Sequence, residues 1–162
     1  MPNQEAIAVI GAGRLDAAIL GFERSLNDWR DGWGEHEQLR SQRQREHLDT
    51  KGSGMWPPLA DSTLRRKLRD PRASFLEILQ LTGGLYRSHT APGAPHNVSD
   101  KRPLSFDFGS TDPLGVIHHE GRGRVPKRTV LYVSDSEMSA HEEMLVDKGA
   151  AKARGQGIEV VE

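Results

Sequence analysis

The feature that most constrains this sequence is a series of apolar residues with helical spacing near its N-terminus. Its members recur at intervals of three and four residues: Leu15, Ile19, Phe22, Leu26, Trp29 and Trp33. This spacing places all of these side chains on one face of an α-helix, while charged residues fill the opposite face. The pattern predicts a helix from about residue 15 to residue 48, and a domain built around it.

The second half of this predicted helix has a different character. After Trp33 the apolar positions thin to Leu39 and Leu48, among Gln, Arg and Glu residues. We therefore expect residues 36–54 to form an extended arm and loop, or one side of a contact between subunits. Gly32 and Gly34 each cost a helix about 1 kcal/mol relative to Ala, so they are expected to kink it or to end its first half.

Shorter elements are expected downstream, together with a first strand over residues 5–10. Asp61 and the Asp70-Pro71 pair predict two helix starts, and Asp112-Pro113 predicts a third helix that Gly121 closes. Residues 104–108 alternate between apolar and polar side chains, which is typical of a half-buried strand. Residues 129–133 are β-branched and aromatic and give the clearest strand signal.

A last helix is predicted to begin after Ser134, which has capping-box spacing to Glu137, and to stop near Gly149. Together the elements predict an α+β fold, in which a small antiparallel sheet packs with a long N-terminal helix and several shorter helices. Residues 1–148 would form one domain containing a polar loop at 89–102. Residues 149–162 would form a C-terminal tail, with 158–161 as a possible added strand.

Composition sets limits on function. The chain has 162 residues, which suits one domain, and only 35% of them are hydrophobic. Part of it should therefore be disordered, or ordered only by packing on other subunits; composition does not choose between these. The absence of cysteine excludes disulfides, zinc-thiolate sites, iron–sulfur clusters and thiol catalysis.

Charge and hydropathy argue against two further classes. There are 22 basic and 23 acidic residues, whereas a dedicated nucleic-acid binder normally carries a basic excess. No apolar stretch is long enough to span a bilayer and no signal-peptide pattern opens the chain, so we expect a soluble protein made in a cytoplasm.

Three motifs in the sequence bear on its chemistry. The Gly11-Ala-Gly13 turn partly imitates a dinucleotide-binding loop, but Asp16 occupies the third glycine position, so a plain turn is favoured. His118 and His119 invite a metal-dependent hydrolase hypothesis, but neighbouring residues on a helix point about 100 degrees apart. A solvent-facing helix end is the favoured interpretation of that pair.

Two basic clusters are the third motif: Arg65, Arg66, Lys67 and Arg69, and Arg122, Arg124, Lys127 and Arg128. They could touch phosphate, or they could form a solvated face or salt bridges across a subunit boundary. A solvated face, or salt bridges across a subunit boundary, is the favoured interpretation. No nucleophile motif, P-loop or nuclease-like acidic cluster is present, so no motif in the sequence indicates an enzyme or a cofactor.

Several segments in order resemble a known family. The long N-terminal helix is followed by Gly54-Met-Trp56-Pro-Pro-Leu59, by Ser62-Thr63, and by Arg66-Lys67. Residues 78–88, residues 117–121 and residues 126–134 follow at matching intervals. This order, over roughly residues 5–148, resembles the phage virion morphogenesis family, the tail completion or neck proteins of tailed bacteriophages and prophages.

The resemblance implies a structural protein of the virion's head–tail junction, assembled in the host cytoplasm as a homo-oligomeric ring, six- or twelve-fold. Such a ring would join the tail to the connector and continue the DNA channel, without reading DNA sequence and without a membrane. Its partners would be other neck, connector and tail-terminator or tail-tube proteins. The interface candidates are Trp56, Leu59, Arg65, Arg66, His118, His119, Arg124 and Arg128. The alternative is a small nucleic-acid-associated factor that uses the basic clusters 65–69 and 122–128.

Overall fold

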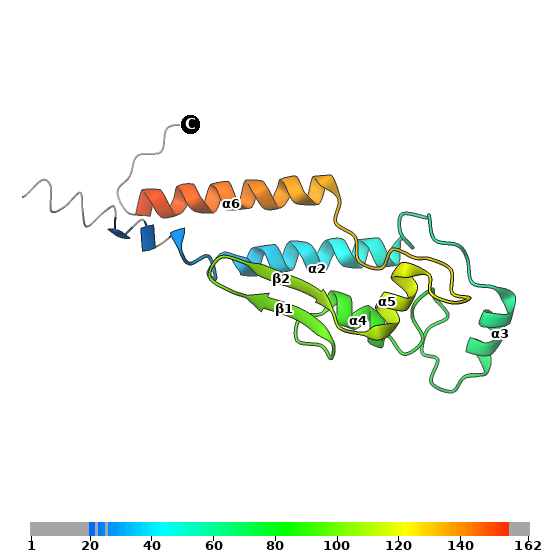
Figure 1. Ribbon diagram of the computed structural model, residues 1–162. Coiled ribbons are helices and arrows are strands. Elements are labelled where there is room, and N and C mark those ends of the chain that lie inside the picture. Colours follow the sequence, from blue (N-terminus) through cyan, green and yellow to red (C-terminus); the bar gives the residue numbers. More distant parts are fainter. Residues whose placement is uncertain (1–19, 22, 25, 156–162) are drawn as a thin grey trace, which may run out of the picture.

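The computed structural model describes residues 20–21, 23–24 and 26–155. Its elements are α2 (Trp33–Asp49), α3 (Asp61–Arg69), α4 (Gly84–Thr90), β1 (Asn97–Lys101), β2 (Phe106–Ser110), α5 (Pro113–Glu120) and α6 (Asp135–Gly155). Figure 1 shows an elongated arrangement in which α6 and α2 lie side by side, with the β1–β2 hairpin and α4 on the other face of α2. Helices α3 and α5 form the end of the molecule farthest from the C-terminal end of α6. The predicted α+β fold is confirmed.

The predicted N-terminal helix is interrupted before α2. Residues 27–32 are not helical, and α2 begins at Trp33 with Gly32 as its N-cap. The backbone N–H of Trp29 instead donates to the carbonyl of Pro103, 2.7 Å away, at the turn of the hairpin. The break at residues 27–32 starts before Gly32, so Gly32 caps the start of α2 and does not end the first half of the predicted helix. The predicted strand at 5–10 and the turn at 11–13 lie outside the described residues.

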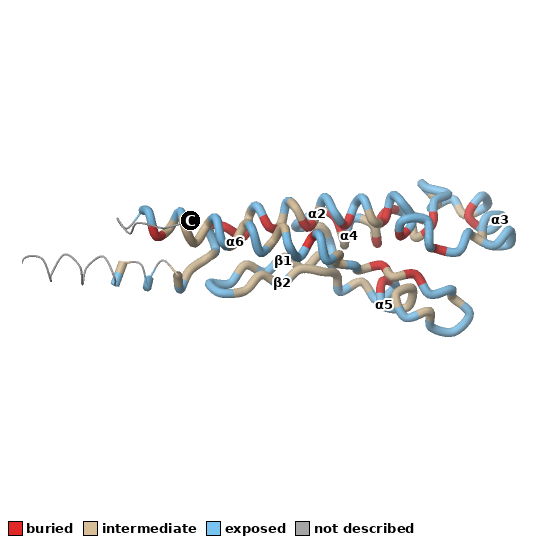
Figure 2. Tube along the Cα trace, turned by 90° about the horizontal axis from the view of Figure 1, so that it is seen from above, coloured by how far each residue is buried: buried red, intermediate tan, exposed pale blue. Residues whose placement is uncertain are grey.

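Helix α2 is not an exposed arm, which corrects the expectation for residues 36–54. Its buried face consists of Trp33, His36, Arg40, Gln44 and Leu48, at spacings of three and four (Figure 2). Three of these five side chains are polar. The buried face therefore lacks the apolar periodicity that would predict it from the sequence. Their hydrogen bonds are met inside the molecule, as a buried polar group requires.

The segment 129–133 is irregular and forms no strand, contrary to the strong strand signal. Its carbonyls accept hydrogen bonds from side chains of α2 instead of from a neighbouring strand. Gln44 Nε2 donates to Val130 O at 2.6 Å, and Arg40 Nη1 donates to Tyr132 O at 2.7 Å. His47 Nε2 lies 2.6 Å from Thr129 O. The polar face of α2 therefore provides the hydrogen-bond partners that a neighbouring strand would otherwise provide.

Helices α2 and α6 are joined by buried polar contacts. Arg40 Nη1 lies 2.9 Å from the Glu137 carboxylate, and both side chains are almost fully buried. His36 and His141 stack, with their Nδ1 atoms 2.8 Å apart, so one nitrogen donates and the other accepts. Near the other end of α6, Lys148 and Lys152 lie within ion-pair distance of Asp31.

The hairpin corrects the predicted polar loop at 89–102. Strand β1 pairs antiparallel with β2, from Asn97 opposite Ser110 to Lys101 opposite Phe106. Strand β1 has a single apolar residue and so no alternating pattern of its own; its pairing is dictated by β2, the half-buried strand that the sequence did predict. Lys101 Nζ ties β1 to α2 through Glu37, at 2.6 Å.

Two more boundaries differ from expectation. The segment that follows Asp70-Pro71 is irregular instead of helical, and Lys67 Nζ donates to the carbonyls of Glu77 and Gln80 within it. Helix α6 continues past Gly149 to Gly155, so the tail predicted at 149–162 begins as helix. In contrast, the capped start and glycine end of α5 were predicted correctly: Asp112 accepts from the N–H of Leu114, and Gly121 has φ 72°.

The apolar core is small. Leu48, Trp56, Ile78 and Val130 form the buried cluster, and Leu59, Leu79 and Tyr86 pack against it. Trp56 and Leu59, two of the interface candidates, therefore anchor the loop after α2 to the core. Within the described part of the chain, no helix combines the length and the apolar character needed to cross a bilayer.

Candidate interface at the α3–α5 end

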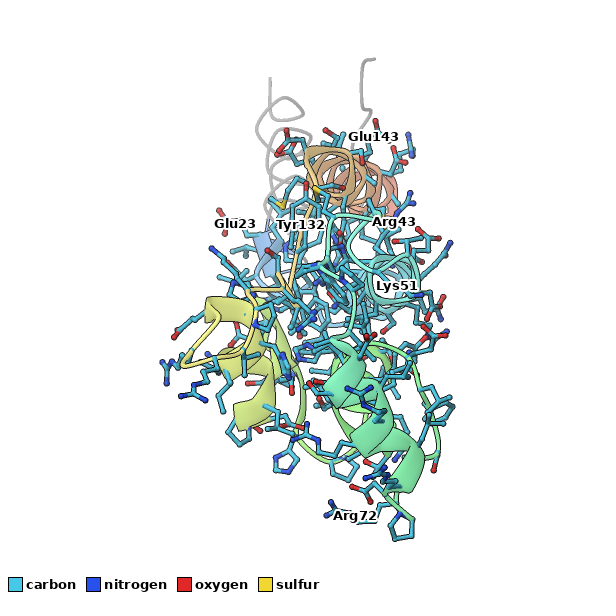
Figure 3. The ribbon with its side chains drawn as sticks, turned by 90° about the vertical axis from the view of Figure 1, so that its right-hand side faces the viewer. Glu23, Arg43, Lys51, Arg72, Tyr132 and Glu143 are labelled. Carbon is cyan, nitrogen blue, oxygen red and sulfur yellow. The ribbon has the colours of Figure 1, made fainter. Side chains whose placement is uncertain are left out.

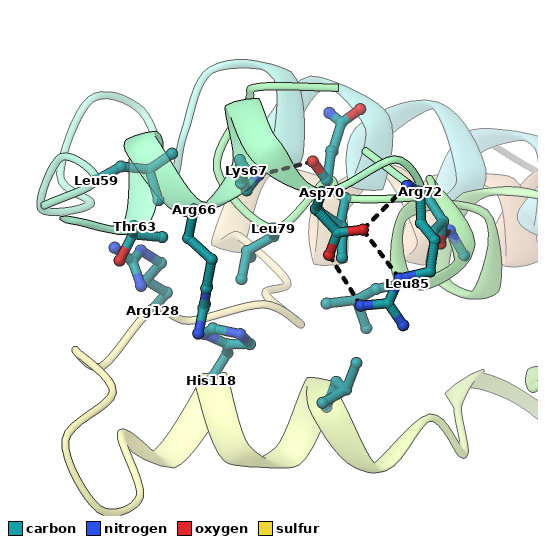
Figure 4. Close-up of a pocket in the computed structure, with 15 residues that line it drawn as sticks. Leu59, Thr63, Arg66, Lys67, Asp70, Arg72, Leu79, Leu85, His118 and Arg128 are labelled. Carbon is teal, nitrogen blue, oxygen red and sulfur yellow. Dashed lines mark hydrogen bonds and ion pairs between the residues drawn. The ribbon is translucent and has the colours of Figure 1, made fainter. Parts of the chain in front are cut away.

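A cavity of about 470 Å³ opens between α3, the segment 79–85 and α5. Four of the eight predicted interface residues line it: Leu59, Arg66, His118 and Arg128. Figure 4 shows them converging from α3, from α5 and from the two loops beside these helices. Figure 3 looks onto this end of the molecule, with α3 and α5 facing the viewer and Arg72 at the lower edge of the view. We refer to this space as the α3–α5 cavity.

One side of the α3–α5 cavity is apolar. Leu59, Leu79, Leu85 and Leu114 line it. Leu85 belongs to the buried residues, whereas Leu114 is 53% exposed. Leu79 has a positive φ of 61°, which is uncommon for a branched residue and is held here by the surrounding contacts. A ligand that enters would remove hydrocarbon from water, which favours binding.

Arg128 is the most unusual group in the cavity. It is only 4% exposed, and no carboxylate of the described residues forms an ion pair with it. Its Nη2 donates to the carbonyl of Pro57 at 3.0 Å, while Nε is buried without a partner. Burial lowers the pKa of this guanidinium below its ordinary value. A buried cation with a single hydrogen bond is costly unless an anion completes it.

The neighbouring groups add to this positive potential. Arg66 is exposed and forms no ion pair with a described residue. Asp70 is the only acid among the lining residues, and its carboxylate is taken by Arg72 at 2.8 Å. The hydrogen bonds from Arg72 lower the pKa of Asp70 to about 2. The cavity is therefore short of negative charge.

His118 completes the basic wall. Its Nδ1 is buried and has no partner. Burial, and then the charge of Arg128, lower the pKa of His118 below its ordinary value. The ring is therefore neutral at neutral pH, and Arg66 and Arg128 supply the charge that an acidic ligand would meet.

The other predicted interface residues lie elsewhere. Trp56 is in the core, Arg65 lies on the outer side of α3 beside Arg69, and Arg124 is exposed in the loop after α5. His119 lines a different cavity of about 200 Å³. His118 and His119 thus do not face a common space, and no cluster of three or more potential ligands that could hold a metal occurs among the described residues.

His89 also lines this second cavity, although no motif in the sequence singles it out. Both of its ring nitrogens are buried without partners, and Nε2 packs against Gly115 of α5. Burial lowers its pKa to about 4. His89 lies at the start of what was predicted to be a polar loop, where nothing in the pattern distinguishes a buried histidine from an exposed one.

Comparisons of this chain with protein-family models, with curated proteins and with solved structures found no match. The resemblance to the phage family therefore stays a prediction that depends on the ordered sequence segments.

Proposed function

We propose that this protein is an architectural subunit of the head–tail junction of a tailed bacteriophage, working in a ring of identical copies that continues the DNA channel. It acts by assembly and not by catalysis. The family resemblance of the sequence supplies the biological setting. The surface of the folded chain supplies the physical support for assembly.

The observation that carries the proposal is the imbalance between buried and exposed apolar side chains. In the described residues only seven hydrophobic residues are buried, whereas twelve large ones are exposed. Six of the exposed ones lie on α3, α5 and the segment between residues 70 and 83: Leu64, Leu68, Phe75, Leu76, Leu114 and Val116. Apolar surface gathered at one end of a molecule is typical of a protein contact.

The arrangement of the two ends favours a ring over a symmetric dimer. The α3–α5 cavity lies at one end of the elongated molecule and the C-terminal end of α6 lies at the other (Figure 1). Contacts between unlike ends are heterologous, and they build closed rings when the rotation between copies closes.

A null mutant in the phage or prophage that encodes the protein tests this function. We expect DNA-filled heads and tails that fail to join in electron micrographs, loss of infectious titre, and recovery when the gene is supplied in trans. Mass spectrometry of purified wild-type particles should detect the protein. Infectious particles that form without it would overturn the proposal.

A second candidate function is supported by the unpaired cations at the same end of the molecule. Arg65, Arg69 and Arg124 form no ion pair with a described residue, and they belong to α3 and to the loop after α5. A nucleic-acid contact made by these groups would weaken steeply with salt. DNA affinity that is unchanged between low and moderate salt, or unaffected by R65A with R69A, would reject this function.

A further inference from the structure

The α3–α5 cavity specifies the chemistry of what it binds. Arg128 requires an anion, and Arg66 presents a second cation at the same wall. The leucines that line the cavity favour a ligand with apolar side chains. A complementary ligand therefore carries apolar side chains followed by a carboxylate, as a short peptide segment does.

The chain contains such a segment beyond α6. Residues 158–162 read Ile158-Glu-Val-Val-Glu162. In an extended peptide alternate residues share one face, so Ile158, Val160 and Glu162 would lie together while Glu159 and Val161 would lie on the other side. One face of the segment thus offers two apolar side chains and then an acid.

This segment cannot reach the cavity of its own molecule. Helix α6 has 21 residues, which corresponds to a length of about 32 Å, and it runs away from the α3–α5 end. The seven residues from 156 to 162 span at most about 25 Å when fully extended. Figures 1 and 2 both place the cavity-forming helix α3 beyond the start of α6, so the segment would have to travel farther than the whole helix. Only another copy can supply it.

We propose that residues Ile158–Glu162 of one copy enter the α3–α5 cavity of the next copy, and that this contact links the subunits head to tail. Ile158 and Val160 pack on Leu79, Leu85 and Leu114, and Glu162 pairs with Arg128 and Arg66. The inference rests on the proposed function in one respect, namely that identical copies assemble with each other.

Disulfide cross-linking tests the contact directly, because the natural chain has no cysteine. Thr63 lines the cavity, and in an extended segment Val161 would lie on the face opposite to Ile158 and Val160. The full-length double variant Thr63→Cys with Val161→Cys should form a ladder of linked multimers under mild oxidation, whereas each single variant should stop at the dimer. The matched control pairs Val161→Cys with Ser139→Cys, at an exposed position of α6. It should form no ladder.

Charge reversal tests the assigned acid. Glu162→Lys and Arg66→Glu should each weaken self-association of the full chain by at least about tenfold in sedimentation velocity, as expected for the loss of a desolvated charge pair. Combining the two should restore most of the association. Glu159→Lys makes the same charge change on the other face of the segment and should alter association by less than about threefold.

The outcomes separate this inference from the proposed function. Self-association without the ladder, or equal effects of Glu159→Lys and Glu162→Lys, would overturn the docked segment and leave the head–tail role intact. A ladder in a protein whose loss does not affect particle assembly would support the contact and overturn the role. A chain that neither cross-links nor self-associates, even at high concentration, would also overturn the inference.

Discussion

Gly52, in the loop after α2, illustrates how a single residue can be fixed by one neighbour. It has a φ of +65°, and a Cβ built there would lie 2.3 Å from the indole Nε1 of Trp56. Nearby Gly54 has a φ of +78° but nothing within 4 Å of such a Cβ. The two glycines therefore share the backbone requirement and differ only in the space around them.

We expect Gly52→Ala to lower the free energy of unfolding by about 3 kcal/mol or more, because Trp56 must leave its buried position. Gly54→Ala should cost only about 1–2 kcal/mol, the strain of a left-handed alanine. Urea denaturation of both variants measures the difference. Equal losses would contradict the packing of Trp56 against Gly52.

Arg128 allows a prediction that is opposite in sign to the usual effect of a core mutation. Replacing a buried, unpaired charge by an apolar side chain of similar length removes a desolvation penalty. We expect Arg128→Met to leave the isolated chain as stable as before, or up to about 2 kcal/mol more stable, in urea denaturation. A loss of several kcal/mol would show that the charge is already compensated within the fold.

His89 makes stability depend on pH. Because burial lowers its pKa to about 4, the unfolded chain binds the proton more readily than the folded chain. The stabilisation from neutral His89 is complete above its ordinary pKa of about 6.5. It is lost as the pH falls from there towards 4, by about 3 kcal/mol at most.

Unfolding free energies of the wild type and His89→Leu, measured from pH 7 to pH 4, isolate this contribution. We expect the variant to lose less stability over that range, because the other titrating groups are common to both proteins. Parallel curves would mean that His89 gains a proton as easily in the folded state as in the unfolded state.

At the scale of elements, the contact between α2 and α6 depends on the buried pair Arg40 and Glu137. Glu137→Gln should cost about 3–5 kcal/mol, because Arg40 is left as a buried charge without its carboxylate. The double variant Arg40→Met with Glu137→Met should recover most of this loss, since neither charge then remains. Thermal or urea unfolding of the single and double variants measures the coupling, and additive losses would contradict it.

The elements that could be predicted from the sequence are those specified by local signals. The Asp112 cap with Gly121 defined α5, the alternation around Phe106 defined β2, and Ser134 marked the start of α6. These signals act within a few residues, so no knowledge of the rest of the fold is needed to read them.

The elements that were predicted wrongly depend on contacts with residues that are distant in the sequence. The buried face of α2 is polar because Gln44 and Arg40 donate hydrogen bonds to the carbonyls of residues 130 and 132. These bonds take the place of the strand pairing that was expected there. Strand β1 exists only because β2 pairs with it. In the site, Arg66 and Arg128 could be named from the resemblance, but that Arg128 is buried without an anion follows only from the packing.

At the scale of the whole molecule, the same substitution should affect self-association differently at the α3–α5 end and on the exposed face of α6. Leu68 on α3 is 64% exposed and Val146 on α6 is 70% exposed. Surface substitutions at both should change the free energy of unfolding by less than about 0.5 kcal/mol.

Leu68→Glu should nevertheless weaken self-association of the full chain, because it places a charge in the apolar patch beside the α3–α5 cavity. Val146→Glu should not. Analytical ultracentrifugation over a range of concentrations compares them, and the same association constant for both variants would place the contact elsewhere.

The way α6 is attached has a consequence for how the molecule comes apart. Only Glu137 and Ala153 of this helix are buried, and its contacts with α2 are an ion pair and a histidine pair. Detaching α6 therefore uncovers little hydrocarbon, so the free energy of that local opening should vary only weakly with denaturant concentration. Burial lowers the pKa of both His36 and His141, so protonation below about pH 6.5 works against their stacking. The protection factors of amide hydrogens along α6, corrected for the intrinsic pH dependence of exchange, should accordingly fall in mild acid, while those of α2 stay high.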